Sequence, residues 1–391
     1  MTWRAAMREA LYGSGGFYAR GERPAAHFRT SVHASARYAA AMLALLREVD
    51  AALGQPPRLD LVDVGAGQGE LLAGMLDLAQ RRPGPDAPPG TAPLAGRIVA
   101  QAVEAAPRPS GLGSQIRWRP EPPDRITGLV IASEWLDNIP LDVAVLTPDG
   151  PRIVLVDPAT GAERGGPAVS PAELSWLREW WPLRQPGARA ELGHSRSAAW
   201  AGLIGRLDRG LAVAADYGHR LASRPVAGSM AGYLGGRPVG PIPDGSRDIT
   251  AHVAVDACAA AGTAAGATHT LLTTQRAALR ALGLAGRRPP LSWAERDPAG
   301  YLSTLQTAGE EAELTETTGL GGFSWLVQAV RVPLPRPLLN LLPGAHTPPD
   351  GTHTPPDSEH TPPDSEHTPV DSEHTPPDSE HTPPDSAHAP L

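Results

Sequence analysis

The chain has 391 residues, 41% of them hydrophobic and 19% charged, which is enough for one large domain or two smaller ones with a substantial core. The formal net charge of −8 comes from the end of the sequence: residues 346–391 hold six Asp, four Glu and no Arg, and the first 345 residues are left with +2. A nearly neutral body does not indicate a nucleic-acid-binding protein.

Three other features narrow the possible functions. The one cysteine, Cys258, excludes an internal disulfide and a multi-cysteine zinc site. All 34 basic residues are Arg, so a P-loop lysine and Schiff-base chemistry are excluded. No apolar run approaches the length of about 18 residues that a transmembrane helix needs, and the N-terminus lacks the apolar segment of a secretory signal. We therefore expect a cytoplasmic protein that does not enter membranes.

Strands and helices alternate along the body in the manner of an α/β sheet. We expect six or seven strands in one doubly wound domain with helical insertions and no strong second domain boundary. In chain order the expected elements are a helix over 34–53, a buried strand over 59–65, a helix over 70–80, a loop over 81–96, a strand over 97–104, a possible short strand over 115–118, a strand over 127–133, a hairpin over 143–158 with Asp149 and Gly150 at its turn, mostly helix over 172–208, a buried strand over 210–218, mostly helix over 248–318 and a final strand over 322–331.

The last part of the chain repeats the unit HTPPDSE every seven residues from residue 346. Proline in every unit and the lack of an apolar seam exclude a coiled coil, and the segment has too few hydrophobic residues to fold. Its regularly spaced His could bind nickel or zinc weakly, and its Thr-Pro pairs could be phosphorylated, but a solvated tail is the favoured interpretation. We expect a folded domain over 1–341 and a disordered tail over 342–391.

The strand over 59–65 leads into a glycine turn with Gly65, Gly67 and Gly69 at alternate positions, followed by a helix. A dinucleotide site has G-x-G-x-x-G spacing, which lets a pyrophosphate approach the helix N-terminus. Here the spacing is G-x-G-x-G, and Asp63 precedes it. S-adenosylmethionine has a cationic amino-acid end and no phosphate, so this turn suits it better than NAD. A purely structural turn is the alternative.

Glu104 ends the next strand, where an acid can accept hydrogen bonds from both hydroxyls of a ribose. It lies 35 residues after Gly69, and the Pro/Gly-rich loop over 81–96 accounts for the long spacing. Together the turn and the two acids predict a cofactor site made of Asp63, Gly65, Ala66, Gly67, Gly69 and Glu104.

Polar side chains also follow two later strands, and ligands of an open α/β sheet lie beyond the carboxyl ends of its strands. Glu134 and Asp137 follow the strand over 127–133. Such a pair can hold a cationic acceptor and accept its proton, or it can stabilise a helix N-terminus. Asp216, Tyr217 and His219 end the strand over 210–218, where either an active site or a capped strand end is expected.

These segments, in this order, resemble the MidA-like methyltransferases, which include the mitochondrial arginine methyltransferase of complex I assembly. The resemblance covers roughly residues 11–331. The family's E-L-G-P-G-R-G resembles 63–69, its E-F-F-D-x-L-P resembles 134–140, and its D-Y-G-H stands unchanged at 216–219. Its G-Y-Y, G-D-F-x-T-S-P-E, G-T-L-R-A-Y-R-G-H and D-L-T-A-x-V segments have counterparts at 16–18, 27–33, 228–236 and 248–253.

The resemblance implies a Rossmann-like class I methyltransferase fold, S-adenosylmethionine as cofactor, and arginine in a protein, such as a respiratory complex I subunit, as acceptor. It adds Thr30 and Ser31 to the cofactor site and implies catalytic roles for Glu134, Asp137, Asp216, Tyr217 and His219. Two family carboxylates are replaced here by His27 and His33, the family proline by Val32, and the arginine of the glycine turn by Gln68.

The leading hypothesis is therefore an S-adenosylmethionine-dependent methyltransferase that binds its cofactor over 63–69. A carboxylate or His219 would take the proton from the acceptor. The replacements at 27, 32 and 33 motivate a second hypothesis, a cofactor-binding assembly or scaffold protein without turnover. An NAD-dependent oxidoreductase is a third, which the glycine spacing disfavours.

Overall fold

A computed structural model describes residues 1–18, 30–81 and 93–342 of the chain. They belong to one compact unit, Met1–His346. His27, most of the loop over 81–96 and the predicted disordered tail lie outside the described residues. Within the described ranges, no helix combines the length and the apolar character needed to cross a bilayer.

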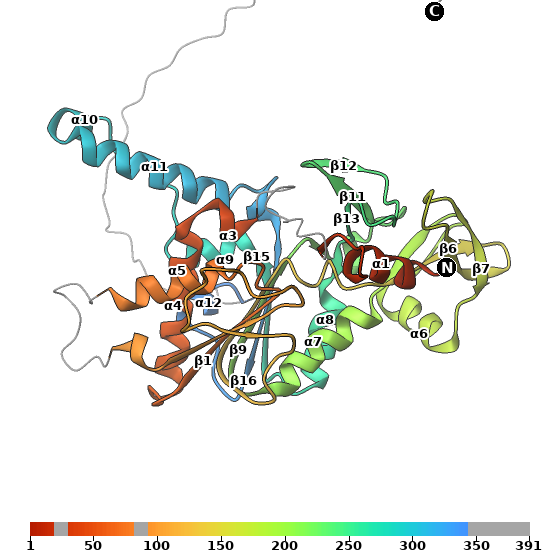
Figure 1. The fold of residues 1–391 in the computed structure, drawn as a ribbon, viewed down its shortest axis with the longest axis horizontal. Coiled ribbons are helices and arrows are strands. Elements are labelled where there is room, and N and C mark those ends of the chain that lie inside the picture. The colour runs from red at the N-terminus through yellow and green to blue at the C-terminus, as the bar shows by residue number, and fades with distance from the viewer. Residues whose placement is uncertain (19–29, 82–92, 343–391) are drawn as a thin grey trace, which may run out of the picture. The chain divides into compact units, whose positions relative to one another are not determined.

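A seven-stranded sheet forms the centre of the fold, in the order β15-β16-β9-β4-β1-β2-β3 (Figure 1). Neighbouring strands from β9 to β3 pair in parallel, and β16 pairs antiparallel with both β9 and β15. The bounds are β1 Leu59–Val64, β2 Ile98–Val103, β3 Arg117–Arg119, β4 Ile126–Ser133, β9 Leu207–Asp216, β15 His269–Thr274 and β16 Ser324–Val330.

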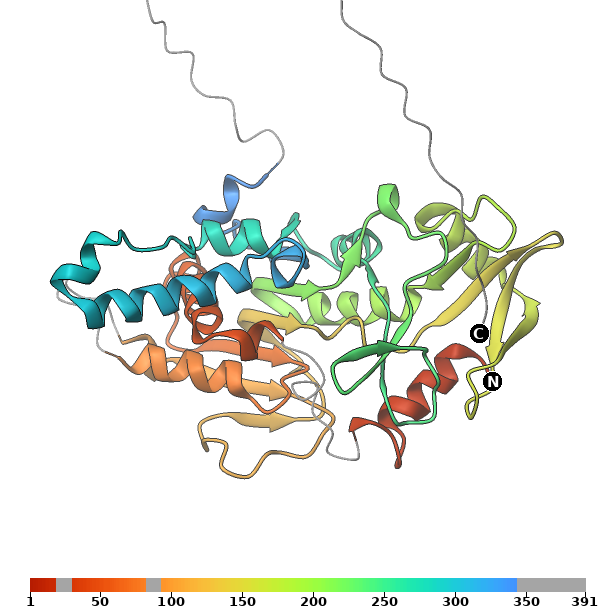
Figure 2. The same cartoon turned by 90° about the horizontal axis from the view of Figure 1, so that it is seen from above.

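Both faces of this sheet are buried, which explains why its strands read as continuous apolar runs. In β1, Leu59 and Leu61 belong to a core shared with α4 and α5, whereas Val62 and Val64 belong to a second core shared with α7 and α8. Figures 1 and 2 show the two groups of helices on opposite sides of the sheet. The predicted doubly wound α/β sheet is confirmed.

Two helices predicted near the glycine turn are present. The predicted helix over 70–80 is α5, and the one over 34–53 is α4. The bounds are α1 Trp3–Tyr12, α3 Ser31–Ala34, α4 Ala36–Ala52, α5 Glu70–Gln80, α6 Pro171–Trp180, α7 His194–Arg206, α8 Val255–Ala264, α9 Gln275–Ala281, α10 Ser292–Arg296, α11 Pro298–Leu314 and α12 Arg336–Leu339, with 3-10 turns at Leu94–Gly96, Leu221–Ser223 and Leu320–Gly322.

Smaller sheets are inserted between the later strands of the central sheet. The predicted hairpin forms β5 and β6 and widens into a four-stranded sheet in the order β7-β6-β5-β8. A three-stranded sheet has the order β12-β11-β13, and β10 pairs with β14. The bounds are β5 Asp142–Thr147, β6 Gly150–Val156, β7 Glu163–Ala168, β8 Arg189–Leu192, β10 Gly218–His219, β11 Ala231–Leu234, β12 Arg237–Val239, β13 Asp248–Thr250 and β14 Val253–Ala254.

The two ranges predicted to be mostly helix contain helices, but strands interrupt them. The range 172–208 contains β8 between α6 and α7, and the range 248–318 contains β13, β14 and β15. β15 has the sequence HTLLTT, whose six residues lie between Ala-rich segments and form an edge strand of the central sheet. Its β-branched threonines favour a strand, but a segment of six residues between two helices is too short to be distinguished from them by its sequence pattern.

Strand β4 carries a glycine that its neighbours require. Gly128 lies opposite Asp60 of β1 and Gly210 of β9, and a Cβ atom at residue 128 would lie 2.0 Å from the carbonyl oxygen of Asp60. Both glycines have positive φ, +150° and +140°. The backbones therefore approach too closely here for any side chain.

We expect Gly128→Ala to lower the free energy of unfolding by about 3 kcal/mol, because the methyl group forces strands apart in a packed core. Chemical denaturation monitored by circular dichroism measures this. Gly202→Ala is the matched control: Gly202 lies on the exposed side of α7 with open space around it, so alanine should stabilise the chain by up to about 1 kcal/mol. Equal effects of the two substitutions would contradict the close strand approach.

Candidate functional site

The glycine turn joins β1 to α5 and has a backbone that only glycine adopts readily. Gly65, Gly67 and Gly69 have φ of +74°, +58° and +82°. A Cβ on Gly65 would lie 3.0 Å from the Trp135 side chain, and one on Gly69 would lie 3.0 Å from Leu112. At Gly67 the nearest such atom is 3.9 Å away, in Glu70. The turn is therefore packed from both sides and open at its middle glycine.

Glu104 lies directly beside this turn. It follows β2, the parallel neighbour of β1, and its Oε2 accepts a hydrogen bond from the Gly67 N–H at 3.1 Å. Its Oε1 accepts from the Ala106 N–H at 3.0 Å. The predicted proximity of Glu104 and the glycine turn is confirmed, while its role toward a ribose stays a prediction.

Asp63, near the end of β1, is almost fully buried under the turn. Burial, together with the negative charges of Glu104 and Glu70, raises the pKa of this carboxyl to about 7. A cation bound at the turn would offset both causes. Three carboxyl groups around one open glycine turn therefore favour a ligand that carries positive charge.

The N-terminal segment 30–33 lies between the turn and the next strand end. His33 Nε2 is 3.1 Å from Glu70 Oε1, and the Ser31 N–H donates to Glu134 Oε1 at 3.2 Å. The buried Ser31 hydroxyl also bonds with the Gln275 side chain at 3.0 Å. Thr30 caps α3 through the His33 N–H. The histidine that replaces a family carboxylate at residue 33 thus contacts Glu70, the first residue of α5.

Four carboxyl groups come together where β4, β9 and β13 end or begin. Asp216 Oδ2 accepts from the backbone N–H of Leu136 at 2.9 Å and of Asp137 at 3.2 Å. The Thr250 hydroxyl donates to Asp137 Oδ2 at 2.7 Å, and the Asn138 amide donates to Asp248 at 3.3 Å. We call Glu134, Asp137, Asp216 and Asp248 the acid cluster.

The acid cluster is buried and incompletely hydrogen-bonded. Asp137, Asp216 and Asp248 are 5%, 1% and 1% exposed. One oxygen of each has no hydrogen-bond partner among the residues the structure describes. Burial raises the pKa of all four members, and the charge of Asp137 acts in the same direction on the other three. Together these causes bring the pKa of Glu134 and Asp248 to about 8. In the same described ranges, no His, Cys, Asp or Glu side chains gather in a group of three or more that could hold a metal ion.

The acid cluster includes Asp248, which the sequence did not single out as a site residue. Its only signal was its place in the 248–253 segment of the family resemblance. Two tyrosines border the cluster as well: Tyr18 donates to the Asn138 side chain at 2.9 Å and Tyr12 to its carbonyl at 3.2 Å. Tyr12 comes from α1, a helix of the first segment that sequence patterns did not connect with the site.

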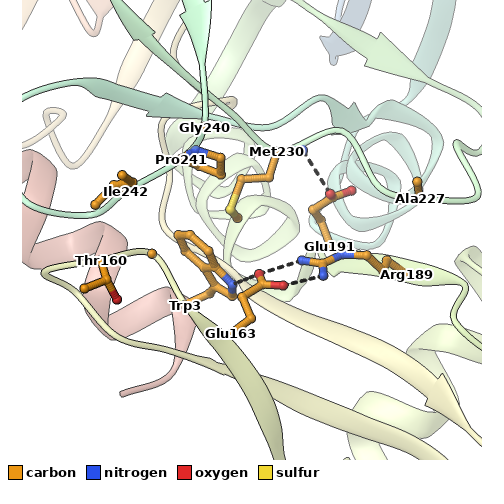
Figure 3. A pocket seen from close by; sticks show the side chains of 11 residues that line it. Trp3, Thr160, Glu163, Arg189, Glu191, Ala227, Met230, Gly240, Pro241 and Ile242 are labelled. Carbon is orange, nitrogen blue, oxygen red and sulfur yellow. Dashed lines mark hydrogen bonds and ion pairs between the residues drawn. The ribbon is translucent and has the colours of Figure 1, made fainter. Parts of the chain in front are cut away.

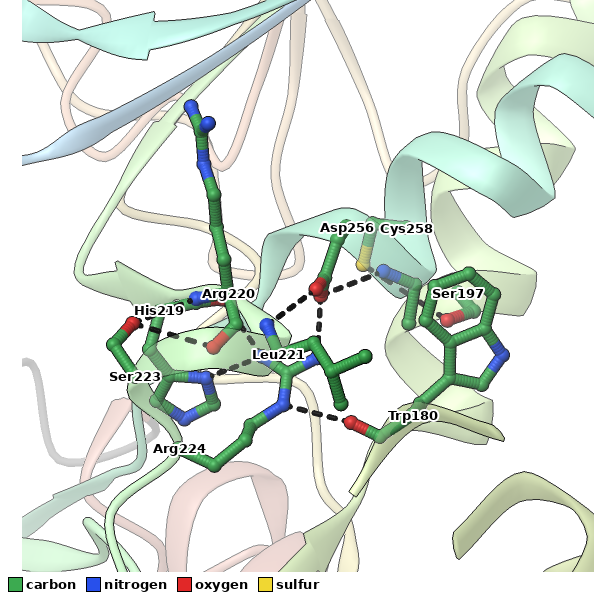
Figure 4. Close-up of polar contacts among 10 residues, drawn as sticks. Trp180, Ser197, His219, Arg220, Leu221, Ser223, Arg224, Asp256 and Cys258 are labelled. Carbon is green, nitrogen blue, oxygen red and sulfur yellow. Dashed lines mark hydrogen bonds and ion pairs between the residues drawn. The ribbon is translucent and has the colours of Figure 1, made fainter. Parts of the chain in front are cut away.

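His219 lies in a different environment (Figure 4). Arg224 Nη1 is 2.7 Å from its Nδ1, and the ring packs edge-on against Trp181 at 4.6 Å. Arg224 also pairs with Asp256. Burial and the Arg224 charge lower the pKa of His219 to about 3. Such an imidazole is a weak base at neutral pH, so the geometry does not favour His219 as the group that takes a proton.

Tyr217, the other non-carboxylate candidate, stays accessible. It is 37% exposed, its ring packs on Phe323 at 4.2 Å, and its carbonyl accepts from the Val253 N–H at 2.8 Å. The structure therefore brings Glu134, Asp137 and Asp216 together, with Tyr217 on the accessible side and His219 packed against Trp181.

Comparisons with known proteins agree with this geometry. No curated protein matches the chain. A family model described as "Putative S-adenosyl-L-methionine-dependent methyltransferase" matches residues 39–273, which include the turn, Glu104 and the strand ends of the acid cluster. The chain belongs to this family. The MidA-like resemblance of the sequence agrees with that membership, and the cofactor is S-adenosylmethionine, as the glycine spacing predicted.

Two solved structures have the same fold. A candidate methyl transferase from Burkholderia thailandensis, solved with S-adenosyl-homocysteine bound, gives a TM-score of 0.69 at 23% identity over 85% of this chain and 88% of that one. An uncharacterized member of the same superfamily from that organism gives 0.66 at 24% identity over the same shares. The predicted Rossmann-like methyltransferase sheet with helical insertions is confirmed.

We expect Glu104→Gln to weaken S-adenosylhomocysteine binding by about tenfold or more, because a charge-assisted hydrogen bond contributes roughly 1.5–3 kcal/mol. Isothermal calorimetry measures the dissociation constant. Glu121→Gln, at an exposed acid after β3, is the control and should bind like the unchanged chain. Unchanged affinity in Glu104→Gln would show that this carboxylate does not contact the ligand.

Asp63 should make stability depend on pH. Its pKa of about 7 in the folded chain lies above the ordinary 3.8, so between about pH 4 and pH 7 the folded chain holds the extra proton. The contribution of Asp63 to the free energy of unfolding therefore falls as pH rises through this window. Asp63→Asn should be more stable than the unchanged chain at pH 8 but not at pH 4, and should bind S-adenosylmethionine more weakly.

Denaturation of the ligand-free chain at both pH values measures this difference, with Asp149→Asn at the exposed hairpin turn as the control. An Asp63→Asn advantage that is the same at pH 4 and pH 8 would contradict a raised pKa.

Proposed function

We propose that this methyltransferase transfers the methyl group of S-adenosylmethionine to an arginine side chain of a protein. The observation that carries the proposal is the acid cluster. Three of its carboxyl groups are almost fully buried, and each has an oxygen without a partner among the described residues. A buried carboxylate is costly unless it is paired, and a guanidinium supplies both a delocalised charge and a fork of N–H donors.

The geometry supports an acceptor that reaches in from a larger molecule. Tyr12 and Tyr217, which lie near the acid cluster, are 42% and 37% exposed. The carboxyl groups behind them are buried. An arginine side chain is long enough to place its guanidinium among the acids while its backbone stays near the tyrosines. A protein surface or an extended peptide would therefore suit the site.

In the reaction, a guanidinium nitrogen forms a bond to the sulfonium methyl carbon while the carbon–sulfur bond breaks. The sulfur leaves as neutral S-adenosylhomocysteine, and the methylated guanidinium loses one N–H proton. The enzyme's main task is to hold donor and acceptor in line. Glu134 suits the proton-accepting role, because its pKa of about 8 lies near neutral pH and its carboxylate is tied through Ser31 to the segment beside the turn.

We expect Glu134→Gln to lower kcat for methyl transfer to arginine by about 100-fold or more, the usual contribution of a general base. S-adenosylhomocysteine affinity should stay unchanged. Glu121→Gln is again the matched control. The measurement uses labelled methyl donor with arginine-rich protein substrates and their lysine-substituted counterparts, followed by amino-acid analysis of the product.

Methylarginine as the labelled product would support the proposal. Label on lysine, on a small molecule or on no acceptor at all would overturn it, and the last result together with normal cofactor binding would favour the scaffold hypothesis.

A further inference from the structure

A cavity of about 560 Å³ is lined by residues outside the glycine turn and the acid cluster (Figure 3). Trp3 of α1, Met230, Pro241 and Ile242 contribute the large apolar side chains of its lining. Its size is that of a ligand site, which is usually apolar with a few polar groups. Neither the family match nor the proposed chemistry explains this space.

The charged groups of the cavity are already paired. Arg189 donates to both oxygens of Glu163 at 2.6 and 2.8 Å, and the Trp3 indole N–H donates to Glu163 at 2.7 Å. Glu191 accepts from the backbone N–H groups of Ser229 and Met230 at 2.7 and 3.2 Å. With its charges satisfied, the cavity favours an apolar group over an ion.

Two sheet edges adjoin the cavity. β7 begins at Glu163 and is the last strand of its sheet, and β12 is the last strand of the three-stranded sheet and runs into Gly240 and Pro241. In the described part of the chain no further strand pairs with the outer side of either. An extended peptide can add to such an edge and place alternate side chains in a neighbouring pocket.

The cavity is connected to the acid cluster by two short routes. Trp3 begins α1 and Tyr12 ends it, so the helix spans roughly 14 Å between them at 1.5 Å per residue. The other route is shorter in sequence: Ala231, next to Met230, pairs with Thr250, whose hydroxyl donates to Asp137. An extended chain covers such a distance in roughly four residues at 3.3 Å each.

We propose that this cavity binds an apolar side chain of the acceptor protein, about four residues from the arginine that is methylated. The methylated arginine in this inference rests on the proposed function, whereas the preference of the cavity for an apolar group does not. The cavity is then a specificity site: the acid cluster selects the guanidinium, and the cavity selects the sequence around it.

The test is a binding selection on the full chain with S-adenosylhomocysteine present. One 13-residue peptide library has a central arginine and random flanks, and a second has alanine at the centre. We expect enrichment of Leu, Met or Phe about four positions from the arginine. Ala227→Trp and Gly240→Trp, which fill the cavity from two walls, should weaken the selected peptides about tenfold, the effect of losing one buried apolar side chain.

Ala222→Trp is the matched control, an exposed alanine of the same segment outside the cavity, and should leave binding unchanged. Apolar enrichment that is lost in the filled variants but persists in the alanine library would support the cavity and overturn the cationic acceptor. Arginine-dependent binding without apolar enrichment would overturn the proposed role of the cavity and support arginine as the acceptor. Enrichment that survives both filled variants would have the same meaning. Binding of no peptide would overturn the inference.

Discussion

The arrangement of the acid cluster depends on the hydrogen bonds of the buried Arg196 guanidinium. From α7 it donates to the backbone carbonyls of Asp137, Ile139, Ala251 and His252. These carbonyls belong to the loop after β4 and to the turn after β13, two segments more than a hundred residues apart. Arg196 is 1% exposed, so these bonds cannot be exchanged for water. Arg196 thereby fixes two backbone segments: the one that carries Asp137 and the one that follows Asp248.

Arg196 also sets the electrostatics of the acid cluster. Its charge lowers the pKa of Asp137 and Asp216, but burial acts more strongly in the opposite direction and the pKa of both stays raised. The charge of Arg196 alone therefore does not offset the free-energy cost of burying these carboxyl groups in their ionised form. Stability and function oppose each other here, as they often do at preorganised sites. A second cation would relieve this opposition.

The cofactor side could be predicted from the sequence because it is local. Asp63 to Gly69 lie in one strand-turn-helix unit, and Glu104 ends the very next strand of the sheet. Periodicity and glycine spacing report such units directly. They failed at β15, a six-residue edge strand between helices, where length and composition do not separate strand from helix. The catalytic role of His219 stays a prediction: a strand end shows which residues are adjacent, but not that Arg224 lies 2.7 Å from the imidazole Nδ1.

The acid cluster could be predicted only in part, because it is assembled from distant segments. Glu134 and Asp216 follow the paired parallel strands β4 and β9, and such strand ends can be recognised in a sequence. Tyr12 and Asp248 come from an N-terminal helix and an inserted three-stranded sheet, and no period or spacing in the sequence indicates their contacts with the cluster. The fold thus keeps the glycine turn and Glu104 within the parallel sheet, whereas part of the acid cluster and the tyrosines beside it come from segments outside that sheet.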